Sequence, residues 1–187
     1  MQSLEKIEER LELKTKNLVL MALLVGVGTV LYFVIPGYGN GMKPDFMLTM
    51  MFIGIFLFPT FKESFLLSIT TGILSGLFTT FPGGLVPNII DKAITGLVFL
   101  LVVLALKHFA KNIAVGTVLV GLGTILSGTI FLTSALLLSG LPDAFDVLFT
   151  IVVLPATAMN AVAFIVIYPI ITNILKRSKF ETAVTPA

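Results

Sequence analysis

The sequence predicts an all-α integral membrane protein with six transmembrane helices. Of the 187 residues, 57% are hydrophobic and only 12% are charged, whereas about a quarter of the residues in soluble domains are charged. The mean hydropathy is +1.08. One helical crossing of a hydrocarbon core about 30 Å thick takes about 20 apolar residues, so six spans use nearly the whole chain. Because no room is left for a soluble catalytic module, we expect that the protein is not an enzyme.

The expected spans are separated by short segments in which glycine and proline interrupt helix. Three glycines and a proline fall within residues 36–41, and similar breaks occur at 81–84 and 140–143. The second span is short for a full crossing, so we expect it to tilt little or to borrow its ends from neighbouring helices. The six spans cover about residues 17–35, 44–59, 65–80, 87–106, 113–138 and 145–175.

Both ends of the chain are expected outside the membrane domain of residues 17–175. Residues 1–16 are predicted to form a cytoplasmic amphipathic extension, which either lies on the inner membrane surface or forms a solvated helical tail. Residues 176–187 are expected to form a cytoplasmic tail. The apolar side chains of the extension follow an i, i+3, i+7 spacing among charged residues, at Leu4, Ile7 and Leu11.

The distribution of lysine and arginine predicts the orientation, because short basic segments resist translocation across the membrane. With six spans, only Lys43 and Lys92 fall on one side. We therefore expect a multi-pass protein of the cell membrane, surrounded by lipid, with both termini in the cytoplasm. The cytoplasmic side collects ten basic residues, Lys6, Arg10, Lys14, Lys16, Lys62, Lys107, Lys111, Lys176, Arg177 and Lys179.

Charge and residue usage exclude several classes of ligand. A net charge of +2 is too small and too scattered for a nucleic-acid surface, so nucleic acid is not an expected partner. With no cysteine and one histidine, we expect neither a metal site nor a cofactor. The chain also lacks the GxxxxGK[ST] phosphate-binding motif, so an ATP-driven motor would have to lie in another protein.

A first candidate site lies at the start of the second span, where Asp45 follows Lys43 and Pro44. Charges inside a span cost about 2.5 to 3.5 kcal/mol near the bilayer centre, so they tend to be paired or functional. Proline favours the first helical position, which would place Asp45 in the opening turn. An aspartate in that turn also complements the helix dipole without any ligand, so both interpretations stay open.

A second candidate site lies at the start of the fourth span, where Asn88, Asp91, Lys92 and Thr95 share one helix face. A cation one turn into a helix opposes the helix dipole, so Lys92 needs an anionic partner. A neighbouring aspartate would suffice, and so would a bound carboxylate. Two acids and two bases at one membrane depth suggest a pocket for a small zwitterion, for example an α-amino acid.

Polar and sulfur-containing side chains inside other spans extend these sites. Asn160 places an amide well inside the bilayer, where it serves either a ligand or interhelical hydrogen bonding. Met47 and Met50 lie just beyond Asp45 on the second span. They either contact an aromatic ligand or simply pack.

Small residues on the first span, Ala22 and Gly26, would let another helix approach closely. Glycines on the third and fifth spans would also allow close approach, and we expect most of them to serve internal packing. We therefore expect the first span to be the one that an external partner contacts.

Five motifs lie along the spans and their connections: GMKPD at 41–45, FPGG at 81–84, the Asp91-Lys92 pair, GTILSG at 123–128 and LPA at 154–156. Together they resemble the TrpP family of bacterial tryptophan transporters, over about residues 14–179. That family resembles the substrate-binding (S) components of energy-coupling factor transporters. The resemblance implies a six-helix S-component bundle, a ligand site near the outer face, and a partner module of one transmembrane subunit and two ATPases.

In S components the first helix typically carries an alanine-xxx-alanine surface for that partner. Here the matching pair is Ala22 and Gly26, which keeps the small size of both residues but departs from the pattern.

These observations lead to the hypothesis of an S component that captures L-tryptophan from outside the cell. Asp45 or Asp91 would take the ammonium, and Lys43 or Lys92 would take the carboxylate. The indole would lie among Phe81, Met47 and Met50, with Asn88 or Asn160 bonded to its N–H group. The alternatives are a stand-alone secondary transporter driven by an ion gradient, and a structural membrane protein whose outer charges pair with each other.

Overall fold

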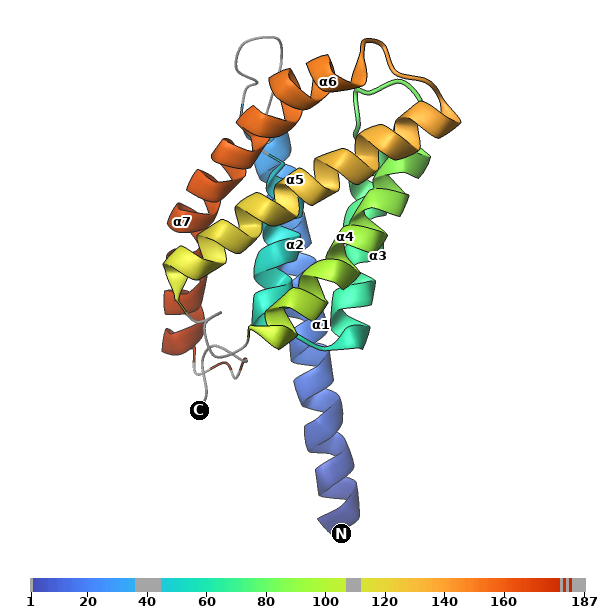
Figure 1. The fold of residues 1–187 in the computed structure, drawn as a ribbon. Coiled ribbons are helices and arrows are strands. Elements are labelled where there is room, and N and C mark those ends of the chain that lie inside the picture. The colour runs from blue at the N-terminus through green and yellow to red at the C-terminus, as the bar shows by residue number, and fades with distance from the viewer. Residues whose placement is uncertain (1, 36–44, 107–111, 179, 181, 183–187) are drawn as a thin grey trace.

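The computed structural model describes residues 2–35, 45–106, 112–178, 180 and 182, with the backbone alone over residues 2–14. Every regular element in these ranges is a helix, as the sequence predicts (Figure 1). The elements are α1 (Gln2–Val34), α2 (Phe46–Leu57), α3 (Phe61–Leu77), α4 (Leu85–Ala105), α5 (Ile113–Leu138), α6 (Phe145–Leu148), the π-helical segment η1 (Phe149–Val153) and α7 (Leu154–Arg177).

These bounds lie within a few residues of the expected spans, and α3 differs most. It begins at Phe61 and includes the charged residues Lys62 and Glu63 in its first turn. The apolar pattern omits charged residues and therefore predicts a start near residue 65. Several basic residues used for the predicted orientation, Lys107, Lys111 and Lys179, lie outside the described residues, as do the side chains of residues 2–14.

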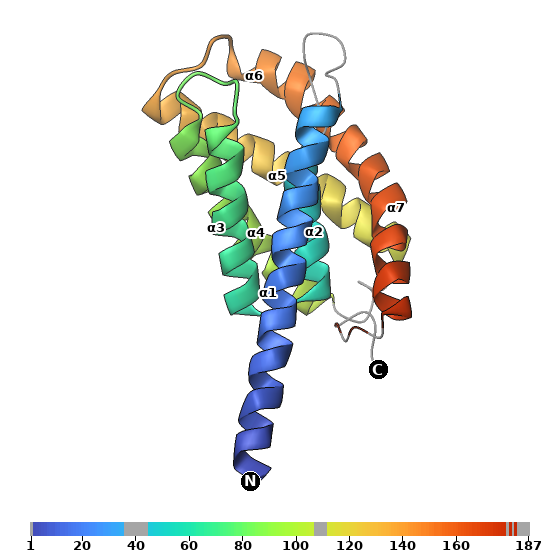
Figure 2. The ribbon, with the colours of Figure 1, turned by 180° about the vertical axis from the view of Figure 1, so that it is seen from behind.

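α2 lies at the centre of the bundle. It contacts α1, α3, α4, α5 and α7, and all of its residues are buried. Figure 2 shows α1 lying along one side of α2, while α5 crosses the bundle obliquely. The start of α1 and the end of α7 lie at one end of the bundle, and the α3–α4 and α5–α6 turns lie at the other (Figure 1).

Four helical stretches are long and apolar enough to cross a membrane: Thr15–Val34, Leu85–Ala105, Ile113–Leu138 and Phe145–Arg177. By contrast, α2 has 12 residues and α3 has 17. Twelve residues rise only about 18 Å, less than the roughly 30 Å of the hydrocarbon core. Other helices cover α2 along its whole length, so it does not need to span the hydrocarbon core by itself.

The outward surface of the bundle is apolar. The exposed fraction is 79% for Leu137 and 71% for Val34, and large apolar side chains are exposed on each of the longer helices. Soluble proteins rarely expose contiguous apolar surface on this scale. This surface and the four long apolar helices identify an integral membrane protein.

α1 continues without a break from Gln2 to Val34. Its first half projects beyond the bundle along the helix axis (Figures 1 and 2). The amphipathic extension expected for residues 1–16 stays a prediction.

The last span contains a π-helical turn just before Pro155. Proline has no N–H group, and its ring excludes the carbonyl oxygen four residues earlier. The turn just before it is widened over Phe149–Val153, and the Leu154 N–H group donates to the Phe149 carbonyl oxygen five residues back. The wider turn therefore accommodates the proline without ending the helix.

Aromatic side chains fill the core between α2, α4 and α7. Phe52 stacks on Phe99 with ring centroids 4.1 Å apart, and Phe164 stacks on Tyr168 at 4.7 Å. Such pairs contribute about 0.5–1.5 kcal/mol each beyond the area that they bury. A Cβ atom at Gly123 of α5 would lie 2.7 Å from the Phe52 ring, so this glycine lets the ring reach the centre of the bundle.

Two glycines allow α3 and α4 to pack closely. A Cβ atom at Gly72 would lie 3.0 Å from the Cα atom of Ile89, and one at Gly76 would lie 2.8 Å from the carbonyl oxygen of Leu85. Both neighbours are backbone atoms, which cannot move without shifting the helix. This pair therefore sets the distance between the two helices and confirms the expected internal role of the third-span glycines.

We predict that Gly76→Ala lowers the thermal unfolding temperature of the purified protein in detergent. Overpacking against backbone costs about 1–3 kcal/mol, and this outweighs the gain of about 1 kcal/mol in helix propensity. Gly121→Ala is the matched control, because a Cβ atom there would meet only Thr157 Cγ2 at 3.7 Å. If both variants unfold at or above the wild-type temperature, the α3–α4 packing is not limited by Gly76.

Candidate ligand-binding site

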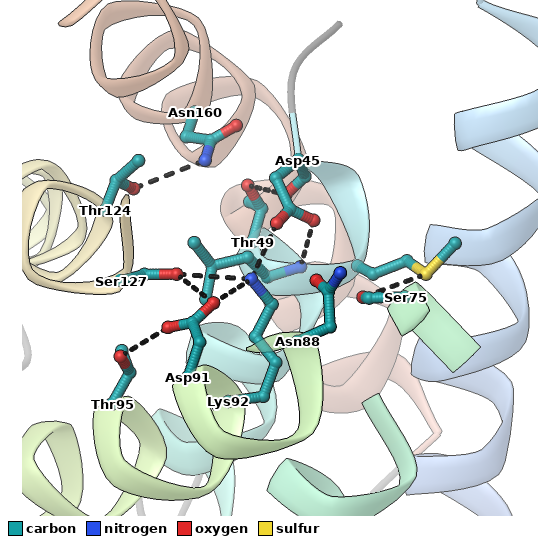
Figure 3. Close-up of polar contacts among 12 residues, drawn as sticks. Asp45, Thr49, Ser75, Asn88, Asp91, Lys92, Thr95, Thr124, Ser127 and Asn160 are labelled. Carbon is teal, nitrogen blue, oxygen red and sulfur yellow. Dashed lines mark hydrogen bonds and ion pairs between the residues drawn. The ribbon is translucent and has the colours of Figure 1, made fainter. Parts of the chain in front are cut away.

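Three charged side chains meet inside the bundle. The Lys92 ammonium lies 2.9 Å from Asp45 Oδ2 and 2.7 Å from Asp91 Oδ2. Figure 3 shows Asp45 approaching from α2 and the other two from α4, with Ser127 of α5 on the opposite side. We call Asp45, Asp91 and Lys92 the ion cluster.

Asp45 is held in place as the N-cap of α2. Its Oδ1 atom accepts a hydrogen bond of 2.9 Å from the Leu48 N–H group, and its carbonyl oxygen accepts one of 3.1 Å from Thr49 Oγ1. The predicted position was inside the first turn, but the helix begins one residue later, at Phe46. Capping satisfies one of the unpaired N–H groups at the helix start and aims the carboxylate at α4.

Lys92 lies two turns into α4 and is almost completely buried, with 3% of its side chain exposed. The sequence predicts that this cation needs an anionic partner, and the structure supplies two. Its third hydrogen bond goes to Ser127 Oγ at 3.2 Å. Because an ammonium group has three N–H donors, these three contacts use all of them.

Asp91 is fully buried, and three donors surround it. Its Oδ1 atom accepts from Thr95 Oγ1 at 2.9 Å, and its Oδ2 atom accepts from Ser127 Oγ at 2.8 Å and from the Lys92 ammonium. The i, i+4 spacing predicted Thr95 on this face, and the hydroxyl of Ser127 closes the network from α5. These hydrogen bonds offset the free-energy cost of burying the carboxylate.

The ion cluster forms part of the wall of a cavity of about 370 Å³, within the range of small-molecule sites. Three aromatic side chains, Tyr32, Phe81 and Phe131, also line it. The Phe81 and Phe131 rings meet edge to face with centroids 5.2 Å apart. The cavity therefore offers charge at one part of its wall and aromatic and aliphatic surface at another, including Met47, Leu132, Leu148, Val152 and Val153.

The structure brings six of the nine candidate ligand-site residues to this cavity. They are Asp45, Met47, Phe81, Asn88, Asp91 and Lys92. Asn88 donates from Nδ2 to the Gly84 carbonyl oxygen at 2.8 Å, while Met47 accepts a hydrogen bond from Ser75 at its sulfur.

Of the other three candidates, two lie away from the cavity and one is outside the described residues. Met50 does not line the cavity and lies against α1, where a Cβ atom on Gly28 would lie 3.1 Å from its Cγ atom. Asn160 is fully buried behind the wall and donates to Thr124 Oγ1 at 3.3 Å. Lys43 lies outside the described residues.

Sequence reasoning missed the contributions of α5 to this site. Thr124 and Ser127 line the cavity at an i, i+3 spacing, and Phe131 follows one turn later. The signal was present in the GTILSG motif, whose two hydroxyl residues lie inside an otherwise apolar span. They lacked a charge, and hydroxyl groups in a span can bond to their own helix, so the sequence alone did not mark them.

The candidate docking pair on α1 lies on the outside of the bundle. Both Ala22 and Gly26 are exposed, and a Cβ atom on Gly26 would meet nothing within 4 Å. Gly28, on another side of the helix, packs against α2 instead. In the described part of the chain, no group of three His, Cys, Asp or Glu side chains could hold a metal ion.

We predict that Lys92→Met lowers the free energy of unfolding by about 3–5 kcal/mol, because it leaves two carboxylates without their shared cation. The measurement is thermal or denaturant unfolding in detergent without ligand. Lys62→Met removes the same charge from an exposed site on α3 and should change stability by less than about 0.5 kcal/mol. Equal stability of the two variants would contradict a stabilising ion cluster.

Comparison with known proteins gives a consistent result. The family described as tryptophan transporter TrpP matches residues 14–176. A probable tryptophan transport protein of Bacillus subtilis (strain 168) is 49% identical over 171 residues, covering 91% of this chain and 99% of the relative. Those of Clostridium acetobutylicum and Clostridium perfringens are 42% and 36% identical, covering 84% and 88% of this chain and 92% and 95% of the relatives.

No solved structure matches this chain. The relatives are transport proteins and not enzymes. The chain therefore belongs to the tryptophan transporter TrpP family.

Proposed function

We propose that this protein captures L-tryptophan at the outer face of the cell membrane, as the substrate-binding component of an uptake system driven by a separate ATP-hydrolysing module. One observation carries the proposal: a single cavity joins a buried ion cluster to an aromatic and aliphatic wall. This combination suits a ligand with a charged backbone end and a large aromatic end. The family match and the names of the relatives support tryptophan as that ligand.

The two ends of the ligand have different partners in this proposal. The α-ammonium binds a carboxylate of the ion cluster, Asp45 or Asp91, through charge-assisted hydrogen bonds. The indole lies against Phe81, Phe131 and Met47, which offer ring and sulfur contacts. Asn88 is the amide best placed for the indole N–H group, because it lines the cavity and Asn160 lies behind the wall.

The proposed topology has six membrane-crossing segments with both termini in the cytoplasm. Four long apolar helices support it. In this proposal the chain makes the other two crossings at α3 and at α2, which is too short to span alone and is covered by neighbouring helices. The start of α1 and the end of α7 at one end of the bundle fit an even number of crossings (Figure 1). Lys176 and Arg177 close α7 at that end, as expected for the cytoplasmic side.

The proposed partner is an energy-coupling module with a transmembrane subunit and two ATPases. The chain has no phosphate-binding motif of its own, so ATP hydrolysis must come from another protein. The exposed α1 face around Ala22 and Gly26 is the proposed contact, because its small side chains would let a partner helix approach closely.

We predict saturable binding of radiolabelled tryptophan to the purified protein, weakened at least about tenfold by Asp91→Asn. Asp146→Asn, an exposed acid outside the cavity, should bind as the wild type does. Proteoliposomes that contain this chain alone should bind tryptophan without accumulating it. Accumulation driven by a proton or sodium gradient would instead support a stand-alone secondary transporter, and absence of any binding would remove tryptophan as the ligand.

Single-cysteine labelling can test the proposed orientation, since the native chain has no cysteine. We predict that a membrane-impermeant maleimide labels Asp143→Cys on intact cells. It should label Lys62→Cys only after the cells are permeabilised. Both positions are exposed in the structure, and the unmodified chain supplies the background. The reverse pattern would invert the topology.

A further inference from the structure

The ion cluster has an excess of negative charge. It holds two carboxylates, Asp45 and Asp91, and one ammonium, Lys92. Lys92 is the one cationic side chain among the described residues that line the cavity. When all three groups are ionised, the described wall of the cavity therefore lacks one positive charge.

Lys92 has no hydrogen-bond donor to spare for a ligand. Its three N–H groups are directed at Asp45, Asp91 and Ser127, and an ammonium group has no fourth. A ligand carboxylate could reach Lys92 only by displacing one of these acceptors. Displacing Asp45 or Asp91 would leave a carboxylate in the wall without its partner, which is costly at a buried site. Displacing Ser127 instead would bring a third carboxylate against one ammonium.

The two carboxylates differ in their access to the cavity. Asp91 is fully buried and already accepts three hydrogen bonds, from Thr95, Ser127 and Lys92. Asp45 has 31% of its side chain exposed and accepts one side-chain and one backbone donor. Because two carboxylate oxygens offer about four acceptor sites, Asp45 keeps capacity for a further donor on its open side.

From these contacts we infer that the cavity recognises the ammonium group of its ligand, with Asp45 as the acceptor, and that Lys92 does not bind the ligand carboxylate. This inference deepens the proposed function and rests on it. The ligand ammonium supplies the positive charge that the described wall lacks. The charged groups then follow one another in the order ligand ammonium, Asp45, Lys92 and Asp91, with alternating sign. Lys92 keeps its role of holding both aspartates in place.

The inference distinguishes between the two charged groups of an amino acid. An aromatic amine without a carboxylate keeps the group that Asp45 recognises. An aromatic acid without an amine loses that group and brings a second negative charge toward Asp45 and Asp91. The chemical class that the cavity selects is thus an arylalkyl ammonium, and amino acids are members of that class.

The test is competition with radiolabelled tryptophan on the purified wild-type protein. Tryptamine, which lacks the carboxylate, should compete within about tenfold of unlabelled tryptophan, and indole-3-propionate, which lacks the amine, should be weaker than tryptamine by about 100-fold. Competition by the acid at lower concentration than the amine would overturn the inference, while tryptophan binding itself stayed intact. Failure of labelled tryptophan to bind would instead reject the proposed function.

A variant pair sharpens the assignment to Asp45. Asp45→Asn keeps the shape and the cap but removes the charge, so it should weaken tryptamine and tryptophan alike by about tenfold or more. The same change should leave indole-3-propionate unweakened. Asp146→Asn, which removes an exposed acid outside the cavity, should change none of the three. If Asp45→Asn weakens only the ligands that carry a carboxylate, Asp45 is not the acceptor of the ammonium.

Discussion

The site depends on the salt bridge between Lys92 and Asp45. The two residues are 47 positions apart in the sequence, and their charged atoms lie 2.9 Å apart. An unpaired ammonium inside a membrane protein is costly, and an unpaired carboxylate is equally so. Their pairing lowers the cost of both charges and ties the start of α2 to α4. Ser127 extends the same network to α5, so three helices share one polar centre.

The central position of α2 follows from its length and its surroundings. Twelve residues are too few to cross the hydrocarbon core, so α2 is stable only where other helices cover it. Close packing makes this possible: Gly28 of α1 lies against its first turns, and Gly123 of α5 receives the ring of Phe52. The N-cap residue of this buried helix, Asp45, is then delivered to the interior of the bundle and not to its surface.

The cavity lies where this polar centre meets the turns at one end of the bundle. Its charged part comes from α2 and α4, and its aromatic part from the α3–α4 turn, α1 and α5. The π-helical turn of the last span contributes Val152 and Val153 to the same wall. π-helical turns recur at functional sites, and here the feature traces to Pro155, which prevents a regular turn at that point.

Composition and periodicity determined that this chain is an all-helical membrane protein, because apolar runs of this length have no other stable state in a bilayer. The spacing of Asn88, Asp91, Lys92 and Thr95 on one helix face also followed from sequence, since helix geometry is local. Tertiary structure decided which groups meet. It turned Met50 away from the cavity, placed Asn160 behind the wall and brought Ser127 into contact with the ion cluster. These outcomes depend on how separate helices rotate and pack against one another.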